Sequence, residues 1–498
     1  MCRRIWRSDF AAWFPLLRRR SLLSDQHQET LTPTKNAKIS RVACPIGHRS
    51  YASKPRGLGQ SPSNEPVFHP QIRQRTLYRK LNQLLAEANF DRTVEKICQP
   101  YYHSHIGRPG IPPGVYFRML LVGYFEGIGS QRGIAWRCGD SLSLREFLGT
   151  PLTEDTPDHS SLTKVRDRLP LEVHTTVFQL VLKLAAEKGL LKGKTVGVDS
   201  TTLEANAAMK SLVRRDTGED WNEYLRRLLQ EQEGVENPTD EELRRFDRQR
   251  KDKRVSNEEW MSPTDQDSRI GKMKDGRTHL MYKAEHVVDL ETEVVLAAPI
   301  YHGDAGDPDT MVDSVMDAQT NLSEAGIDVE IEEAAADKGY HATDTLELAD
   351  SLNIRTYIPE PKRKGKRNWQ GVPEEKRRAV INNRRRTRGA RSKRLQRLRS
   401  ERVERSFAHV CDTGGARRSW LRGIEKVQKR YLIAAVARNL GLIMRKVFAV
   451  GTPKGLQAEG GLVSSVCFAW LHIRCYLWRS HFVSPSPSAL SFAYVTVA

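Results

Sequence analysis

The sequence predicts an α/β protein in which a mixed β-sheet is flanked by helices and preceded by an all-helical N-terminal domain. Three observations predict this fold class. Residues 76–190 carry apolar side chains at helical spacing. Residues 193–207 bring alternating and β-branched residues, which are typical of a strand. From residue 278 onward, strand-like and helix-like segments alternate, which is typical of a mixed sheet.

The helical part begins with a predicted helix at 76–98. The Pro-Pro pair in "GRPGIPPGVYFRMLL" favours the start of a long apolar-faced helix, because proline fits the first helical turn. A short helix is expected at 161–168, with Asp158 or Ser160 as its N-cap and Pro170 as its end.

This short helix is expected to expose Lys164, Arg166 and Arg168. Such a basic face is either a solvated surface or a surface that contacts DNA, and the sequence leaves both readings open.

The α/β part starts with a strand at 195–199 and continues through a charged helical insertion at 214–269. Two strands joined by a turn are expected within 278–304. The remaining expected elements are a helix at 307–326 closed by Gly326, a strand within 327–340, a helix at 342–353, a strand at 354–359, and, after a basic segment at 362–394, a helix that begins near Leu395.

Acidic residues stand at two of the expected strand ends. Asp199 ends the first strand and Asp337 ends the fourth. Side chains at neighbouring strand ends point into one crevice, so the two carboxylates are expected to meet. The helix containing "QRLRSERVERSFAHV" offers a third acid, with Glu404 at the edge of its apolar face and Glu401 as the more solvated rival. Each acid taken alone is an ordinary turn, cap or surface residue.

Three converging carboxylates would repel each other strongly, so the pattern predicts a bound divalent cation. Ligands that are all oxygen favour Mg²⁺ or Mn²⁺ over zinc. Two such ions are suited to phosphoryl transfer, because one can activate the attacking oxygen while the other stabilises the leaving oxygen.

The charge of the chain points to a polyanionic partner. The 498 residues carry a formal net charge of +19. Residues 362–405 alone hold nineteen Lys and Arg against four Asp and Glu, which is either a solvated charge run or a clamp for the DNA backbone. Trp369 lies inside this run and could stack on an unpaired base. The expected DNA contacts are Lys164, Arg166, Lys362, Arg363, Lys364, Trp369, Arg384, Arg385, Arg386, Arg399 and Arg402.

The chain ends and the cysteines indicate less about the function than the acids and the basic segment do. The seven cysteines form no CxxC pair or zinc spacing, which favours a reduced cytosolic protein. Residues 1–66 are expected to be a disordered or spurious extension, and 451–498 a C-terminal tail. The apolar stretch 462–478 is short and carries His472 and Arg474, so a buried or partner-facing helix is favoured over a membrane span.

Four motifs in order resemble the DDE transposases of bacterial insertion sequences: "VGVDSTTLEANA", "SPTDQDSRIGKMKDGRTHLMYKAEHVVDLETEVV", "AAADKGYHA" and "VERSFAHV". The stretch 76–170 resembles the N-terminal helical domain of the same proteins. The resemblance covers roughly 70–450. Some relatives place a lysine about two turns after the glutamate, where Cys411 stands in this sequence.

The resemblance implies a helical DNA-binding domain at 67–190 and a ribonuclease-H-like catalytic domain at 191–450. It implies Asp199, Asp337 and Glu404 as catalytic, metal-binding residues. The implied activity is metal-dependent DNA cleavage and strand transfer at the ends of an insertion sequence. The implied partners are double-stranded DNA and a second copy of the chain, in the cytoplasm with the nucleoid and without a membrane. A stand-alone Mg²⁺-dependent nuclease and a catalytically silent DNA-binding remnant are the alternatives.

Overall fold

The computed structural model describes residues 73–102, 110–235, 237–251, 255–362, 365 and 367–451. The predicted extension at 1–66, all but the first residue of the predicted tail at 451–498, and the apolar stretch 462–478 lie outside these residues. In the described part of the chain, no helix is long and apolar enough to cross a membrane.

The centre of the fold is a seven-stranded mixed sheet built around β1 (Thr195–Glu204). β1 pairs antiparallel with the long strand β5 (Thr278–Asp289) and parallel with the short strand β8 (Glu333–Ala335). The other members are β4 (Arg269–Lys272), β6 (Val295–Ala297) and β7 (Ile300–His302), which pair with β5, and β9 (Arg355–Tyr357), which pairs with β8. This mixed sheet confirms the predicted fold class.

The strands differ from the sequence predictions in three ways. β1 runs to Glu204 rather than stopping at residue 199, and β4 was not predicted. The second strand expected within 278–304 is divided into β6 and β7 around Pro299. Proline has no N–H to give to the ladder, which accounts for the break.

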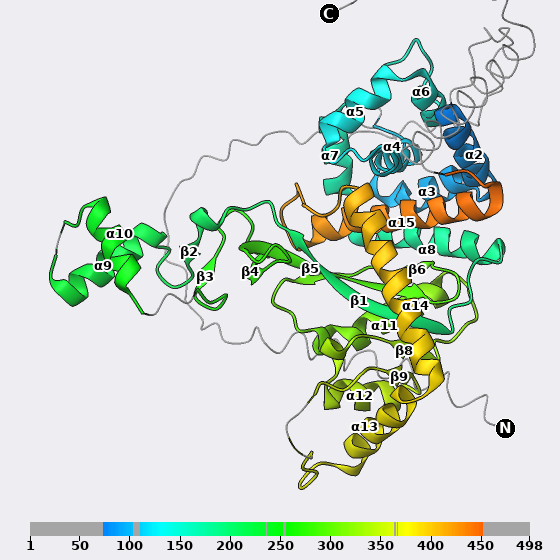
Figure 1. Ribbon diagram of the computed structural model, residues 1–498. Coiled ribbons are helices and arrows are strands. Elements are labelled where there is room, and N and C mark those ends of the chain that lie inside the picture. The colour runs from blue at the N-terminus through cyan, green and yellow to red at the C-terminus, as the bar shows by residue number, and fades with distance from the viewer. Residues whose placement is uncertain are drawn as a thin grey trace, which may run out of the picture. The chain divides into compact units, whose positions relative to one another are not determined.

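Two helical layers cover opposite faces of the sheet. His286 of β5 bonds through Nδ1 to the Ser406 hydroxyl of α14 (Ala390–Phe407) at 2.7 Å. Its neighbour Glu285 accepts a 2.7 Å hydrogen bond from the Thr310 hydroxyl of α11 (Asp307–Glu324). Successive residues of a strand point to opposite faces, so α14 and α11 lie on the two sides of the sheet. Figure 1 shows α14 crossing in front of the strands.

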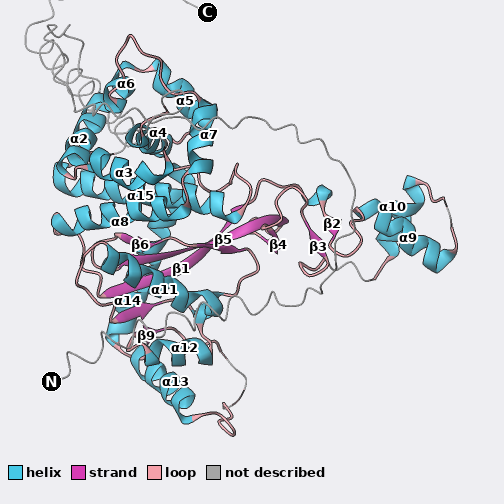
Figure 2. Cartoon of the chain, turned by 180° about the vertical axis from the view of Figure 1, so that it is seen from behind, coloured by secondary structure: helices cyan, strands magenta, loops and turns pink. Residues whose placement is uncertain are grey.

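The described residues before β1 form helices, as predicted (Figure 2). The helix expected at 76–98 is broken at Asn89, whose φ of 49° is left-handed and ends the first helix. Asp158, not Ser160, caps the short basic helix. The elements are α2 (Arg73–Glu87), α3 (Phe90–Cys98), η1 (Gln99–Tyr101), α4 (Pro113–Glu126), α5 (Gln131–Asp140), α6 (Leu142–Leu148), α7 (His159–Arg168) and α8 (Leu171–Glu187).

A helix from the far end of the chain completes this helical region. α15 (Ile424–Phe448) packs against α8 and α4, and nearly all of its residues from 431 to 444 are buried. Its Asn439 side chain also bonds both backbone groups of Val295 in β6, at 3.0 Å and 2.8 Å. α15 therefore joins the helical region to the sheet.

The charged helical insertion expected at 214–269 contains two helices, α9 (Trp221–Glu233) and α10 (Asp240–Gln249). Each helix starts with a capping box, at Asp220 and Thr239 respectively. The two helices share a small core of their own, formed by Leu225, Leu229, Leu243 and Phe246. The flanking elements are η2 (Met209–Ser211), β2 (Val213–Arg214) and β3 (Trp260–Met261), the last two forming a separate two-stranded sheet.

The basic segment 362–394 contains a helix that was not predicted, α13 (Glu374–Thr387), and α14 begins at Ala390 rather than near Leu395. The buried residues of α13 form a narrow stripe, Ala379, Val380 and Asn383. The remaining elements are η3 (Lys338–Tyr340), α12 (Thr343–Ser351) and the π-helical segment η4 (Ala408–Thr413), which continues α14.

Candidate active site

The register of the sheet brings Asp199 and Asp337 side by side. Gly197 of β1 pairs with Ala335, the last residue of the parallel strand β8. Asp199 and Asp337 each follow two residues later, so they reach the same level of the sheet on the same face. They lie where the C-terminal end of β8 opens beside β1, the usual place for a site in such a sheet.

Backbone groups and one guanidinium hold the two carboxylates. Oδ1 of Asp199 accepts a hydrogen bond from the Ser200 N–H at 2.9 Å, and Oδ1 of Asp337 accepts one from the Gly339 N–H at 2.7 Å. Nη1 of Arg399, from α14, lies 2.6 Å from Oδ2 of Asp199. Burial raises the pKa of Asp199; the charge of Asp337 raises this pKa further, while Arg399 opposes both effects.

Glu404 does not join Asp199 and Asp337 in a cluster. Its exposed carboxylate accepts a 2.9 Å hydrogen bond from the Ser400 hydroxyl. Among the described residues, no three or more His, Cys, Asp or Glu side chains lie close enough together to hold a metal ion. Glu404 does not face Asp199 because it lies five positions after Arg399, which places it about 140° further around the helix. The position nearest Asp199 is therefore taken by Arg399.

The rival acid Glu401 is engaged elsewhere. Its carboxylate forms a 2.6 Å ion pair with Nη2 of Arg405 one turn later on α14. Among the described residues, the partner recorded for the Glu404 carboxylate is the neutral Ser400 hydroxyl, and no cation pairs with it. Of the two candidates, Glu404 is the one whose charge remains available for a cation.

A second polar group lies on the other face of β1, and the sequence did not reveal it. Lys283 is buried, and its Nζ lies 2.8 Å from Oδ1 of Asp307 and 3.5 Å from Oε2 of Glu285. The Ser200 hydroxyl donates to Oδ1 of Asp307 at 3.0 Å. Burial raises the pKa of Glu285, and Lys283 opposes that rise. The available signal was two charges at alternate positions of the otherwise apolar strand "YKAEHVV".

Gly339 separates the two polar groups at a point with no room for a side chain. A Cβ added there would lie 3.0 Å from Oδ1 of Asp337 and 3.1 Å from Oδ2 of Asp307. The carboxylates of Asp337 and Asp307 therefore approach each other across this glycine. A cavity of about 350 Å³ opens beside them, lined in part by Ser200, Asp307, Lys272 and Lys274.

Comparison with known families gives two matches. Residues 66–168 match a family model described as "Transposase domain (DUF772)", and residues 247–440 match one described as "Transposase DDE domain". No curated protein matches the chain. The chain belongs to the DDE transposases of insertion-sequence type. Its sheet therefore has the ribonuclease-H-like fold of that family. In this transposase, Asp337 and Glu404 fall inside the second match, and Asp199 falls between the two matches.

Several basic side chains expected to contact DNA are used inside the transposase. Arg384 forms two 2.9 Å hydrogen bonds to the Glu360 carboxylate. Arg386 donates to the Thr356 carbonyl at 3.0 Å. Arg402 donates to the Leu290 carbonyl, and Arg399 is paired with Asp199. These four arginines help to dock α13 and α14 on the rest of the transposase, which the sequence pattern did not indicate.

The other expected contacts differ in exposure. Lys164, Lys362 and Arg385 are exposed. Arg166, expected to be exposed on α7, is instead buried with 8% of its surface accessible. Trp369 is half-buried, with the guanidinium of Arg367 4.5 Å from its ring centre. Arg363 and Lys364 lie outside the described residues.

Proposed function

We propose that this transposase binds the double-stranded DNA ends of its element, cleaves the DNA there and joins the cut end to target DNA. The observation that carries the proposal is the adjacency of Asp199, in the middle of β1, and Asp337, just after β8, in a chain with a transposase DDE domain. The formal net charge of +19 is consistent with a polyanionic substrate.

DDE transposases generally depend on a divalent metal ion, and the residues of this site fit one. Asp199 and Asp337 offer hard oxygen donors, and burial together with the neighbouring charge raises the pKa of Asp199, so a cation between them would relieve an unfavourable arrangement. We propose that these two acids hold Mg²⁺ or Mn²⁺, in two ions. Glu404 lies apart from them in this structure, so its proposed part as the third ligand requires α14 to shift when metal and DNA bind. Such ions would neutralise phosphate charge and lower the pKa of the attacking water.

The side chains of the transposase itself have assigned parts in this proposal. Ser200 N–H and Gly339 N–H each fix one carboxylate oxygen, which preorganises Asp199 and Asp337 before DNA arrives. Arg399 favours the ionised form of Asp199. Lys272 and Lys274 line the cavity beside Ser200 and Asp307, on the other face of β1, and would bind phosphates of the DNA away from the cleaved bond.

An element has two ends, so we propose that two copies of the chain act together as a homodimer, each cutting one end. The reaction would take place on the nucleoid in the cytoplasm. Because the substrate is DNA, its binding should weaken steeply as the salt concentration rises.

The test is Mg²⁺-dependent nicking of DNA that carries the element ends, by the wild type and by Asp337→Asn. The matched control is Asp344→Asn, which changes an exposed acid on α12 that is paired with Lys376. The proposal predicts loss of nicking in Asp337→Asn and wild-type nicking in Asp344→Asn. Equal activity in the wild type and Asp337→Asn would sink the assignment.

Two further readouts separate the alternatives. A stand-alone nuclease would cleave DNA without joining strands and without preference for element ends. A silent DNA-binding remnant would bind DNA but show no Mn²⁺ site that depends on Asp199 and Asp337. Strand joining on end-containing DNA, together with Mn²⁺ titration of the two Asn variants, therefore distinguishes a transposase from both.

A further inference from the structure

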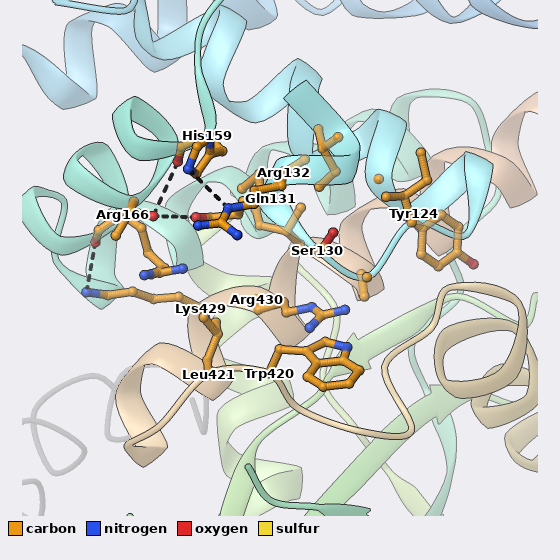
Figure 3. A pocket seen from close by; sticks show the side chains of 18 of the residues that line it. Tyr124, Ser130, Gln131, Arg132, His159, Arg166, Trp420, Leu421, Lys429 and Arg430 are labelled. Atoms are coloured by element: carbon orange, nitrogen blue, oxygen red, sulfur yellow. Dashed lines mark hydrogen bonds between the residues drawn. The ribbon is translucent and has the colours of Figure 1, made fainter. Parts of the chain in front are cut away.

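A second cavity, also of about 350 Å³, lies between the helical region and α15. Residues of α4, α5 and α7 form one wall, and residues of α15 and of the loop 414–421 form the other (Figure 3). The side chain of Trp420, with 52% of its surface exposed, stands in the second wall.

The charged side chains that line this cavity are Arg132, Arg166, Lys429 and Arg430, all cations. The imidazole of His159 lies among them, and no Asp or Glu is among the described lining residues. Arg166 is 8% exposed and Lys429 is 4% exposed. The acids that pair with Lys429 and Arg166 do not line the cavity, so the surface of the cavity itself is basic and suits an anionic ligand.

The partners that the protein supplies to these cations are few. Nζ of Lys429 lies 2.6 Å from the Glu425 carboxylate, and Nη2 of Arg430 donates to the Gly415 carbonyl at 3.2 Å. Nε of Arg166 is buried without a hydrogen-bond partner among the described residues, and Oδ1 of Asp167 lies 3.5 Å away. An unpaired buried donor next to an open cavity is a place for a ligand oxygen.

The two arginines also raise each other's electrostatic energy. Burial lowers the pKa of Arg430, and the charge of Arg166 lowers it further. An anion in the cavity would reverse this effect, because it would attract both guanidinium groups at once.

We propose that this cavity binds a phosphate group of the DNA backbone. The proposal rests on the proposed function, since it takes the DNA of the transposition reaction as the ligand. It adds a contact made jointly by the helical region and α15, apart from the Asp199–Asp337 pair.

A DNA phosphate fits better than a free anion because the cavity wall is linked to the strand of the candidate active site. Arg417, in the loop 414–421, donates through Nη1 to the Thr201 hydroxyl at 3.0 Å, two residues after Asp199 in β1. Arg418 stacks on the Trp420 ring at 4.9 Å and is exposed, so further positive charge lies outside the cavity. A polymer can use both the cavity and this outer charge.

The first test measures DNA binding by the full chain in EDTA, where no cleavage occurs. Phosphate contacts are independent of sequence, so a short duplex of arbitrary sequence is a sufficient probe. For Arg132→Gln combined with Arg430→Gln, the slope of log affinity against log salt should fall by about 1 for each lost phosphate contact. The control is Lys183→Gln, an exposed cation on α8 that does not line the cavity. An unchanged slope in the double variant overturns the proposal.

The second test separates binding from folding. Without DNA, Arg430→Gln should unfold at the wild-type temperature or above it, because the substitution removes a charge that Arg166 repels. A structural role would lower both the unfolding temperature and the DNA affinity. That result would overturn the proposal.

A third arm distinguishes DNA from free phosphate. Inorganic phosphate is added to the wild type and to Arg430→Gln, with chloride at the same ionic strength as the reference. The proposal would be overturned if phosphate stabilised only the wild type while both proteins kept the same salt slope on DNA. None of these measurements needs catalysis, so absent nicking would count against the proposed function and leave this inference standing.

Discussion

Asp199 and Arg399 form an ion pair with 2.6 Å between Oδ2 and Nη1, although 200 residues separate them in the sequence. The pair joins β1 to α14 at the level of Asp337. α14 was expected to bring an acid to this place, and in this structure it brings a base. The negative charge of the site is thus partly neutralised without DNA or metal.

Removing this guanidinium should move the pH dependence of the reaction. Burial and Asp337 raise the pKa of Asp199, and Arg399 opposes them, so Arg399→Gln leaves the pKa still higher. The carboxylate then ionises only at a higher pH. Mg²⁺-dependent nicking by Arg399→Gln should therefore reach its plateau at a higher pH than nicking by the wild type.

The control for this shift is Arg405→Gln, on the same helix, where the arginine pairs with Glu401 and Glu293 instead. Its pH profile should match the wild type. Coincident profiles for Arg399→Gln and the wild type would show that Arg399 does not influence the ionisation that limits the reaction.

Lys283→Met should destabilise the fold, because it leaves the fully buried Glu285 without its cation. Breaking a buried ion pair in this way costs about 3–5 kcal/mol. Changing both residues, Lys283→Met with Glu285→Gln, should restore much of the loss, since the fully buried position 285 then carries no charge and Asp307, which also loses its cation, is partly exposed. Urea unfolding at neutral pH measures both values. A single variant as stable as the wild type would contradict the structural role of the pair.

The loss in Lys283→Met should also depend on pH. Burial raises the pKa of Glu285 in the folded protein, and removing Lys283 raises it further. Between the ordinary pKa of a glutamate and this raised value, the folded state binds more protons than the unfolded state. The stability of the variant should therefore fall as pH rises through that interval. A loss that is the same at every pH would argue against an ionised Glu285.

Gly339→Ala should impair the reaction more than the fold. The added Cβ would lie 3.0 Å and 3.1 Å from oxygens of Asp337 and Asp307, so these carboxylates must move. Contacts this close require shifts of a few tenths of an ångström, so the rate should fall by less than the roughly 10²-fold that a 1 Å displacement costs. A surface substitution usually changes stability by no more than about 0.5 kcal/mol. Nicking rates and urea unfolding test the two parts. Gly389→Ala is the control, because an added Cβ there meets only a carbonyl at 3.5 Å.

Asn383→Leu should loosen α13 from the sheet. The buried Asn383 amide accepts from the Ile358 N–H at 3.1 Å and donates to the Ile358 carbonyl at 2.8 Å. Each backbone group left unpaired and buried costs about 1–3 kcal/mol. Urea unfolding should show a loss of this size, and the neighbouring change Asn382→Leu should show much less. Equal effects would mean that burial on α13, not these two bonds, sets the stability.

The order of the strands and the pairing of Asp199 with Asp337 were predictable, because both depend on local patterns. The pattern places Asp199 in a strand and Asp337 just after another, and the rules of mixed sheets bring such strands together. The short reach of β8 follows from pairing partners that no local pattern specifies. The split between β6 and β7 lies at Pro299, a local signal that the sequence prediction overlooked.

The functions of the charged residues were much less predictable. α13 has only three buried positions, and they lie within a run of arginines. Its hydrophobic pattern was therefore too weak to indicate a helix. Arg384, Arg386 and Arg402 read as a DNA-binding surface, and their partners on Glu360, Thr356 and Leu290 come from distant parts of the chain. The direction in which α14 turns its side chains, which separates Arg399 from Glu404, is likewise a tertiary property.

The packing of α15 bears on how the transposase is made. Two of the described helices before β1, α4 and α8, have one of their main packing partners in α15, which is formed only by residues 424–448. A ribosome therefore has to synthesise almost all of the described chain before the first helices can close their core. Until then, the apolar faces of α4 and α8 are open to other molecules in the cell. Truncated translation products would carry the same exposed faces and would be degraded or aggregate rather than compete for DNA.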